Sequence, residues 1–120
     1  DLPRLPAQAR VEAGYKWGNV LAANERHERA AEIYWMVITR FLENPEDPAE
    51  PLAERGRYWM ARTVMDLGSI LEENSLGREA IRVYEMIGEF GLPGQRLAAA
   101  RLQVIRSSTA PAEASADTQP

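Results

Sequence analysis

The chain has 120 residues, 45% of them hydrophobic, and a formal net charge of −4 from 18 acidic and 14 basic side chains. This length fits one modest domain that buries about two-thirds of its unfolded surface. The acidic balance argues against a nucleic-acid partner, and the lack of cysteine excludes disulfides, thiolate metal sites and thiol nucleophiles. No apolar run approaches the roughly 20 residues of a membrane-spanning helix.

The first regular segment is a pair of helices. Apolar residues recur at steps of three and four over residues 7–24, the spacing of one helix face. A polar turn follows at residues 24–25. The same spacing returns over residues 30–41 and stops before Pro45, so we expect a second helix that packs back on the first.

A second helix pair follows a linker. Residues 44–51 contain three prolines and three acids, which disfavour both helix and strand. A third helix is predicted from Pro51 or the residue after it to Glu73, because proline is compatible with a first helical turn. A fourth helix opens near Gly77 and ends at Gly91.

The end of the chain changes in composition. Residues 95–106 carry apolar positions at helical spacing and predict a capping helix over the open end of the stack. Residues 107–120 have no large apolar side chain, so we expect a disordered tail. The sequence thus predicts one helical domain over residues 1–106, with units at about 7–44 and 51–93.

The two helix pairs repeat each other at a spacing of fifty residues without a gap. Gly18 and Ala30 of the first unit recur as Gly68 and Ala80 of the second. Five further identical pairs are Leu21 with Leu71, Asn24 with Asn74, Tyr34 with Tyr84, Met36 with Met86 and Leu42 with Leu92. We expect the small residues to bring the paired helices close together, with the tyrosine rings filling the space beyond.

The repeated unit resembles the tetratricopeptide repeat (TPR) family, whose consensus reads W-x2-L-G-x2-Y, then A-x3-F, then P. Gly18, Leu21, Ala30 and Tyr34 carry the resemblance in the first unit, and the same residue types stand fifty positions later in the second. The sequence departs from the consensus in the leading aromatic residue and in its period, which exceeds the usual 34 residues.

The resemblance implies an all-α fold: a TPR-like, right-handed stack of two helix pairs plus a C-terminal capping helix. It implies a non-catalytic scaffold module that binds a peptide or partner domain on its concave face. The alternatives are a structural spacer or oligomerisation segment of a larger solenoid, and an accessory domain of an enzyme encoded upstream. Because the chain begins at Asp1 without an initiator methionine, we expect a piece of a longer protein. Irregular units of this kind look like those of bacterial envelope and assembly scaffolds, which favours the envelope or periplasm over the cytoplasm.

In the family, the first helix of each pair lines the concave face. Spacing from the two glycines places ten residues on that face: Glu12, Tyr15, Asn19, Ala22 and Ala23 in the first unit, and Arg62, Met65, Ser69, Glu72 and Glu73 in the second. Such a surface suits an apolar or basic segment held by Tyr15 and Met65. In the alternative interpretation, these two side chains pack against a neighbouring helix and the acids form a solvated face.

Tryptophans suggest a second surface. Trp17 and Trp59 fall on apolar helix faces and are expected in the core. Trp35 lies one position off the apolar stripe, so Trp35, Met36 and Thr39 form a possible outer docking patch for another subunit or repeat. The alternative is that the acidic linker covers Trp35.

Catalytic chemistry has few candidates in this sequence. His27, the one imidazole, lies in a charged turn and is expected to be solvated or capping. Ser69 lacks the strand-to-helix elbow of a serine nucleophile, and the acids of residues 43–50 are interrupted by prolines, unlike a calcium loop. We therefore expect no enzyme activity, no metal and no cofactor, and a protein or peptide as partner.

Overall fold

A computed structural model describes residues 5–45, 48 and 51–118, with side chains described up to residue 108. Over these residues the chain is all-helical, with 81% of it in helices and no strand. The elements are α1 (Ala7–Ala23), α2 (His27–Ile38), the π-helical segment η1 (Thr39–Glu43), α3 (Glu54–Glu73), α4 (Gly77–Glu89) and α5 (Gln95–Thr118). The all-α prediction is confirmed.

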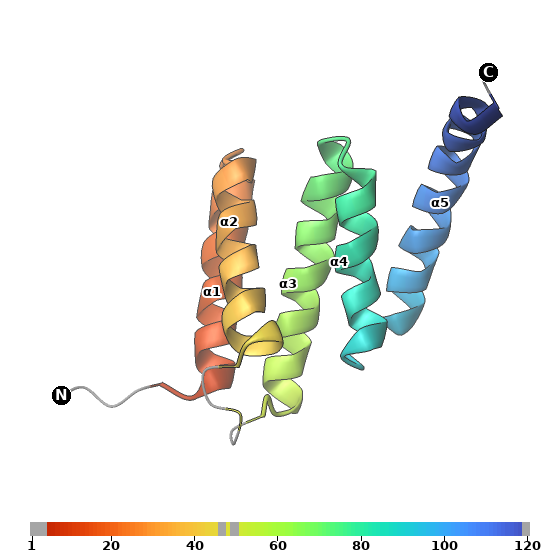
Figure 1. Ribbon diagram of the computed structural model, residues 1–120. Coiled ribbons are helices and arrows are strands. Elements are labelled where there is room, and N and C mark those ends of the chain that lie inside the picture. Colours follow the sequence, from red (N-terminus) through yellow and green to blue (C-terminus); the bar gives the residue numbers. More distant parts are fainter. Residues whose placement is uncertain (1–4, 46–47, 49–50, 119–120) are drawn as a thin grey trace.

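The helices form two hairpins and one further helix, arranged in chain order (Figure 1). α1 packs against α2 and α3 packs against α4, while α3 also contacts both helices of the first hairpin. α5 packs along α4 at the far end. The molecule is therefore elongated, with extents of 64 × 30 × 23 Å.

The two hairpin turns are built in the same way. The side-chain amides of Asn24 and Asn74 each donate to the backbone carbonyl four residues earlier, at 2.8 Å in both turns. The next residues, Glu25 and Ser75, have φ values of 61° and 62°, in the left-handed region. This conformation reverses the chain and ends each first helix in the manner of a C-terminal cap.

Each hairpin closes around a glycine and a tyrosine. A Cβ atom on Gly18 would lie 2.3 Å from Cε1 of Tyr34, and one on Gly68 would lie 2.4 Å from Cε1 of Tyr84. Ala30 and Ala80 are fully buried in the same hairpins. The repeated glycines are therefore needed because a tyrosine ring lies directly on each of them, closer than the sequence analysis expected.

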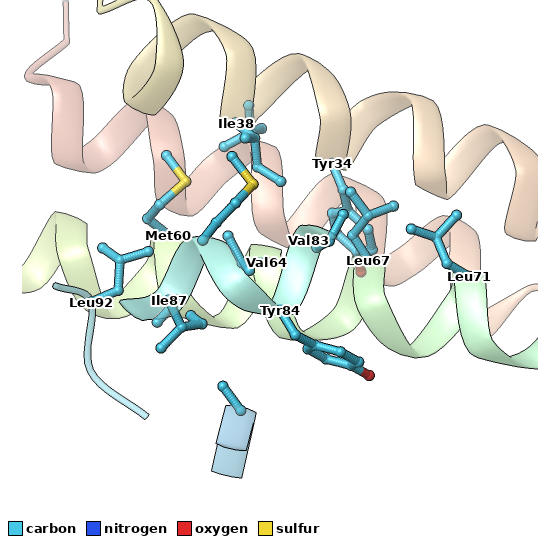
Figure 2. Close-up of a cluster of buried hydrophobic side chains, with 14 of the residues drawn as sticks. Tyr34, Ile38, Met60, Val64, Leu67, Leu71, Val83, Tyr84, Ile87 and Leu92 are labelled. Carbon is cyan, nitrogen blue, oxygen red and sulfur yellow. The ribbon is translucent and has the colours of Figure 1, made fainter. Parts of the chain in front are cut away.

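The core runs continuously through both hairpins and reaches α5. Figure 2 shows Tyr34 and Ile38 of α2 lying opposite Met60, Val64 and Leu67 of α3. All five side chains are buried. The two units are thus joined by an apolar interface, which α5 extends with its buried Ala98 and Ile105.

The helices differ from the predicted ones in three places. α3 begins at Glu54, because the preceding Ala53 is extended, with ψ at 174°. The second helix continues to Glu43 as predicted, but its last turn is π-helical from Thr39. α5 continues to Thr118, whereas the capping helix was predicted to end at Arg106, with a disordered tail over residues 107–120. The four alanines among residues 110–116 explain this, since alanine has the highest helix propensity.

One core prediction was also wrong. Trp17 is 48% exposed on α1, whereas Trp59 is partly buried against the core as expected. Trp17 lies on a side of α1 that none of the described helices covers, so its apolar periodicity does not lead to burial.

Candidate functional site

A groove of about 450 Å³ lies between α3 and α5, with one side chain contributed by α4. We call it the α3–α5 groove. Its lining residues are Met65, Asp66, Ser69, Glu72 and Glu73 of α3, Tyr84 of α4, and Leu97 and Arg101 of α5. It therefore combines two apolar side chains with three carboxylates and one guanidinium group, a composition that suits a mixed apolar and polar ligand segment.

Glu72 is the central polar residue of the groove. Arg101 donates to both carboxylate oxygens of Glu72, with Nε at 3.2 Å from Oε2, and the hydroxyl of Tyr84 donates to Oε2 as well. Burial alone would raise the pKa of Glu72, but the hydrogen bonds from Arg101 and Tyr84 outweigh it and lower that pKa below its ordinary value. One carboxylate thus joins α3, α4 and α5.

A second polar cluster lies between α1 and α3. The hydroxyl of Tyr15 donates to Oδ2 of Asp66 at 2.6 Å and accepts from Nη2 of Arg62 at 2.9 Å. The ring stacks on Tyr34, with centroids 5.9 Å apart, and contacts Trp59 at 5.5 Å. Burial and the neighbouring Asp66 together raise the pKa of Tyr15 to about 12, so this hydroxyl acts as a donor over the whole neutral range.

The predicted contact residues fall into three groups. Met65, Ser69, Glu72 and Glu73 line the α3–α5 groove, so one half of the predicted surface is brought together. Tyr15 is only 3% exposed; its ring packs between helices, which is the alternative interpretation given above, and it adjoins the groove only through Asp66. Arg62 is exposed beside it.

The remaining residues of α1 lie outside the groove lining. Glu12 forms an ion pair with Lys16, with Oε2 and Nζ 2.6 Å apart. Asn19 and Ala23 are exposed, and Ala22 is partly buried against the core. Their role in partner binding stays a prediction.

Sequence reasoning missed four lining residues of the groove: Asp66, Tyr84, Leu97 and Arg101. Tyr84 was expected only as a ring that fills the space between the paired helices. Asp66 follows Met65 on α3, so extending the mapped face by one residue would have included it. Leu97 and Arg101 belong to α5, whose position depends on how it packs against α4. No signal within either repeat indicates that position.

The predicted outer patch is divided in the structure. Trp35 is exposed and lines a second groove of about 460 Å³ together with Met86 and charged residues of α4. Met36 is partly buried and Thr39 is exposed, and neither lines this groove. Most of the acidic segment that was expected as an alternative cover for Trp35, residues 46–47 and 49–50, lies outside the described residues.

Among the described residues, no three His, Asp or Glu side chains are gathered closely enough to hold a metal ion. In the same part of the chain, no helix has the length and apolarity to cross a membrane. His27 lies at the start of α2, apart from the α3–α5 groove, and the Nδ1 atom of its ring is buried.

Comparisons of this chain with protein-family models, with curated protein sequences and with solved structures found no match. The TPR resemblance therefore rests on the repeated residues alone.

Proposed function

We propose that this protein is a non-catalytic interaction module that binds a peptide segment of a partner protein in the α3–α5 groove. The observation that carries the proposal is an exposed leucine facing a polar groove. Leu97 of α5 is 57% exposed, and it lines the groove together with Met65 of α3. Ligand sites are concave and combine apolar side chains with a few placed polar groups, and this groove has both.

The arrangement of helices supports the same function. In a TPR-like right-handed stack, α1, α3 and α5 are the first helices of successive units and line the concave face. Two of these three helices form the α3–α5 groove. The polar groups deep in it are already satisfied by internal hydrogen bonds to Asp66 and Glu72, so a partner need not displace them to bind.

The charges define the kind of segment that fits. Asp66 and Glu72 are engaged by Tyr15 and by Arg101, which leaves the exposed Glu73 as the carboxylate open to a partner. We expect a segment with one apolar side chain packed against Met65 and Leu97, and a basic side chain directed to Glu73.

A peptide library tests this proposal directly. Peptides selected from a random phage-displayed library on the wild-type protein should carry an apolar residue close to a basic one. Replacing Leu97→Ala should weaken the binding of the selected peptides at least about tenfold, because an apolar anchor in a groove contributes more than about 1.4 kcal/mol. Ser69→Tyr, which fills the groove from an exposed position of α3, should have a similar effect.

The matched control is Leu76→Ala, since Leu76 is also an exposed leucine but lies in the α3–α4 turn, outside the groove. Binding should be unchanged in this variant, and circular dichroism should show equal helicity in all three. Selected peptides that bind Leu97→Ala and Ser69→Tyr as tightly as the wild type would exclude the groove as the binding site.

A further inference from the structure

The internal repeat allows the surface between units to be mapped by comparing equivalent residues. Ala13, Trp17 and Val20 of α1 correspond to Thr63, Leu67 and Ile70 of α3, fifty positions later. The three residues of α3 are buried, whereas the three of α1 are exposed, Trp17 at 48% and Val20 at 58%. α3 differs from α1 in having another hairpin before it, so this difference in burial marks the face that a preceding neighbour covers.

The face continues onto the second helix of the pair. Met86 of α4 is buried, while its equivalent on α2, Met36, is only partly buried. We call Ala13, Trp17, Val20 and Met36 the α1 end face. This face combines an exposed tryptophan, two smaller exposed apolar side chains and a partly buried methionine, residue types that suit the centre of a protein–protein interface.

The opposite end of the stack is different. Across α5 from its buried Ala98 and Ile105, helical spacing places Arg96, Ala100, Gln103 and Ser107, and all four are exposed. Two large apolar side chains of α5, Leu97 and Val104, are exposed as well, and Leu97 lines the α3–α5 groove. The outer side of α5 is therefore mainly polar. A head-to-tail contact would place the apolar α1 end face on this mainly polar surface, which disfavours an open chain of copies.

The margin of the α1 end face indicates an interface between separate molecules. Arg10 stands where the second unit has the fully buried Met60. Arg29 lies over the ring of Trp17, 5.9 Å from its centroid, and pairs with Glu32 at 2.8 Å. An apolar centre within a charged margin is the usual anatomy of a contact that forms between folded partners.

We propose that the α1 end face is the interface of a closed dimer with a second copy of this chain. A self-complementary contact across a two-fold axis buries the apolar end of each copy against the same end of the other. The two polar α5 ends then point outwards. This inference is independent of the peptide-binding function, because none of its residues lines the α3–α5 groove.

Sedimentation equilibrium over a wide range of protein concentrations tests the dimer. We expect the wild-type mass to rise with concentration and to stop at two copies. Trp17→Glu should stay monomeric, with a dissociation constant at least about tenfold higher, since an interface tryptophan is a typical hot spot. Val20→Glu should also stay monomeric. It tests the same interface even if Trp17→Glu folds poorly.

The matched control is Val104→Glu on α5, where an equally exposed valine lies far along the stack from α1. It should dimerise like the wild type. A wild-type chain that is monomeric at millimolar concentration would overturn the proposal. So would a mass that grows beyond two copies, or variants at Trp17 and Val20 that associate as the wild type does.

Discussion

At the scale of single residues, the contact of glycine with tyrosine defines both hairpins. Gly68 lies under the ring of Tyr84, whose hydroxyl is fixed by Glu72. The ring therefore cannot easily move away from a Cβ atom added at residue 68. Gly18 and Tyr34 repeat the contact in the first hairpin, so the glycine is required by packing and not by its backbone angles.

We expect Gly68→Ala to destabilise the protein by about 1 kcal/mol or more. Overpacking a tight site costs about 1–3 kcal/mol, and the better helix propensity of alanine offsets up to about 1 kcal/mol of this. Gly88→Ala is the control, because its Cβ would meet only Oε1 of Gln95 at 3.7 Å, and it should leave stability unchanged or raise it. Urea denaturation measures both; equal stability of the two variants would contradict the packing argument.

The candidate site could be predicted from the sequence only where it depends on one helix. Met65, Ser69 and Glu72 follow from helical spacing within α3, and the structure places all three in one groove. Arg101 could not be predicted from the sequence, because its contact with Glu72 depends on how α5 packs against the other helices. Tyr15 was ambiguous for a related reason, since spacing alone does not say which side of α1 the next helix covers.

At the scale of elements, Glu72 holds the last helix to the stack. It accepts hydrogen bonds from Arg101 of α5 and from Tyr84 of α4 while lying on α3. The side chain is 18% exposed, so this carboxylate is largely shielded from water. The exposed pair of Glu85 and Arg106 at 2.9 Å also joins α4 to α5, but such surface pairs contribute little.

We expect Glu72→Gln to lower the free energy of unfolding at neutral pH by about 1 kcal/mol, and Glu85→Gln to leave it nearly unchanged. The pKa of Glu72 is lowered in the folded state from 4.5, so its stabilisation is present above that pH and is lost as the pH falls through the folded-state pKa. The Gln variant should therefore lose less stability in acid than the wild type. Thermal melts between neutral and acidic pH measure this; parallel curves would refute it.

Helix identity was predictable from apolar spacing, whereas some helix ends were not. All five helices were expected, and each is present. The π-helical turn of η1 has no counterpart in the second unit, where α4 ends at Glu89 and Gly91 has a φ of 60°. Composition did not predict the end of α5 at Thr118, since a lack of apolar residues says whether a segment can pack, but not whether its backbone is helical.

At the scale of the whole molecule, three buried tyrosines make the stability of the fold depend on pH in the alkaline range. Burial raises the pKa of Tyr34 and of Tyr84 above their ordinary value of 10, with nearby carboxylates adding to it. Tyr15 follows the same pattern. Each neutral hydroxyl thus stabilises the fold fully below pH 10, and this stabilisation is lost as the pH rises through the folded-state pKa.

We expect the melting temperature to fall steeply above pH 10, together with the appearance of tyrosinate absorbance. Tyr15→Phe should be less stable at neutral pH, since Asp66 loses its donor. Its further loss between pH 10 and about 12 should be smaller than in the wild type, because one of the three groups no longer ionises. Identical alkaline curves for the two proteins would exclude Tyr15 as a contributor.

The overall order of the helices followed from the repeat, because two equivalent hairpins with one apolar face each can bury it by packing together. The difference between the two ends of the stack did not follow from the sequence. Trp17 has the apolar spacing of a core residue, and only the position of α1 at the edge leaves it exposed.

The two hairpin turns each contain a residue whose backbone conformation is energetically unfavourable. Glu25 and Ser75 both adopt left-handed backbone angles, which disfavour an L side chain by about 1–2 kcal/mol relative to glycine. The same fold with glycine at residues 25 and 75 should therefore be more stable than this chain. Neither residue lines the α3–α5 groove or belongs to the α1 end face, so glycine at these two positions should raise the melting temperature without changing either surface.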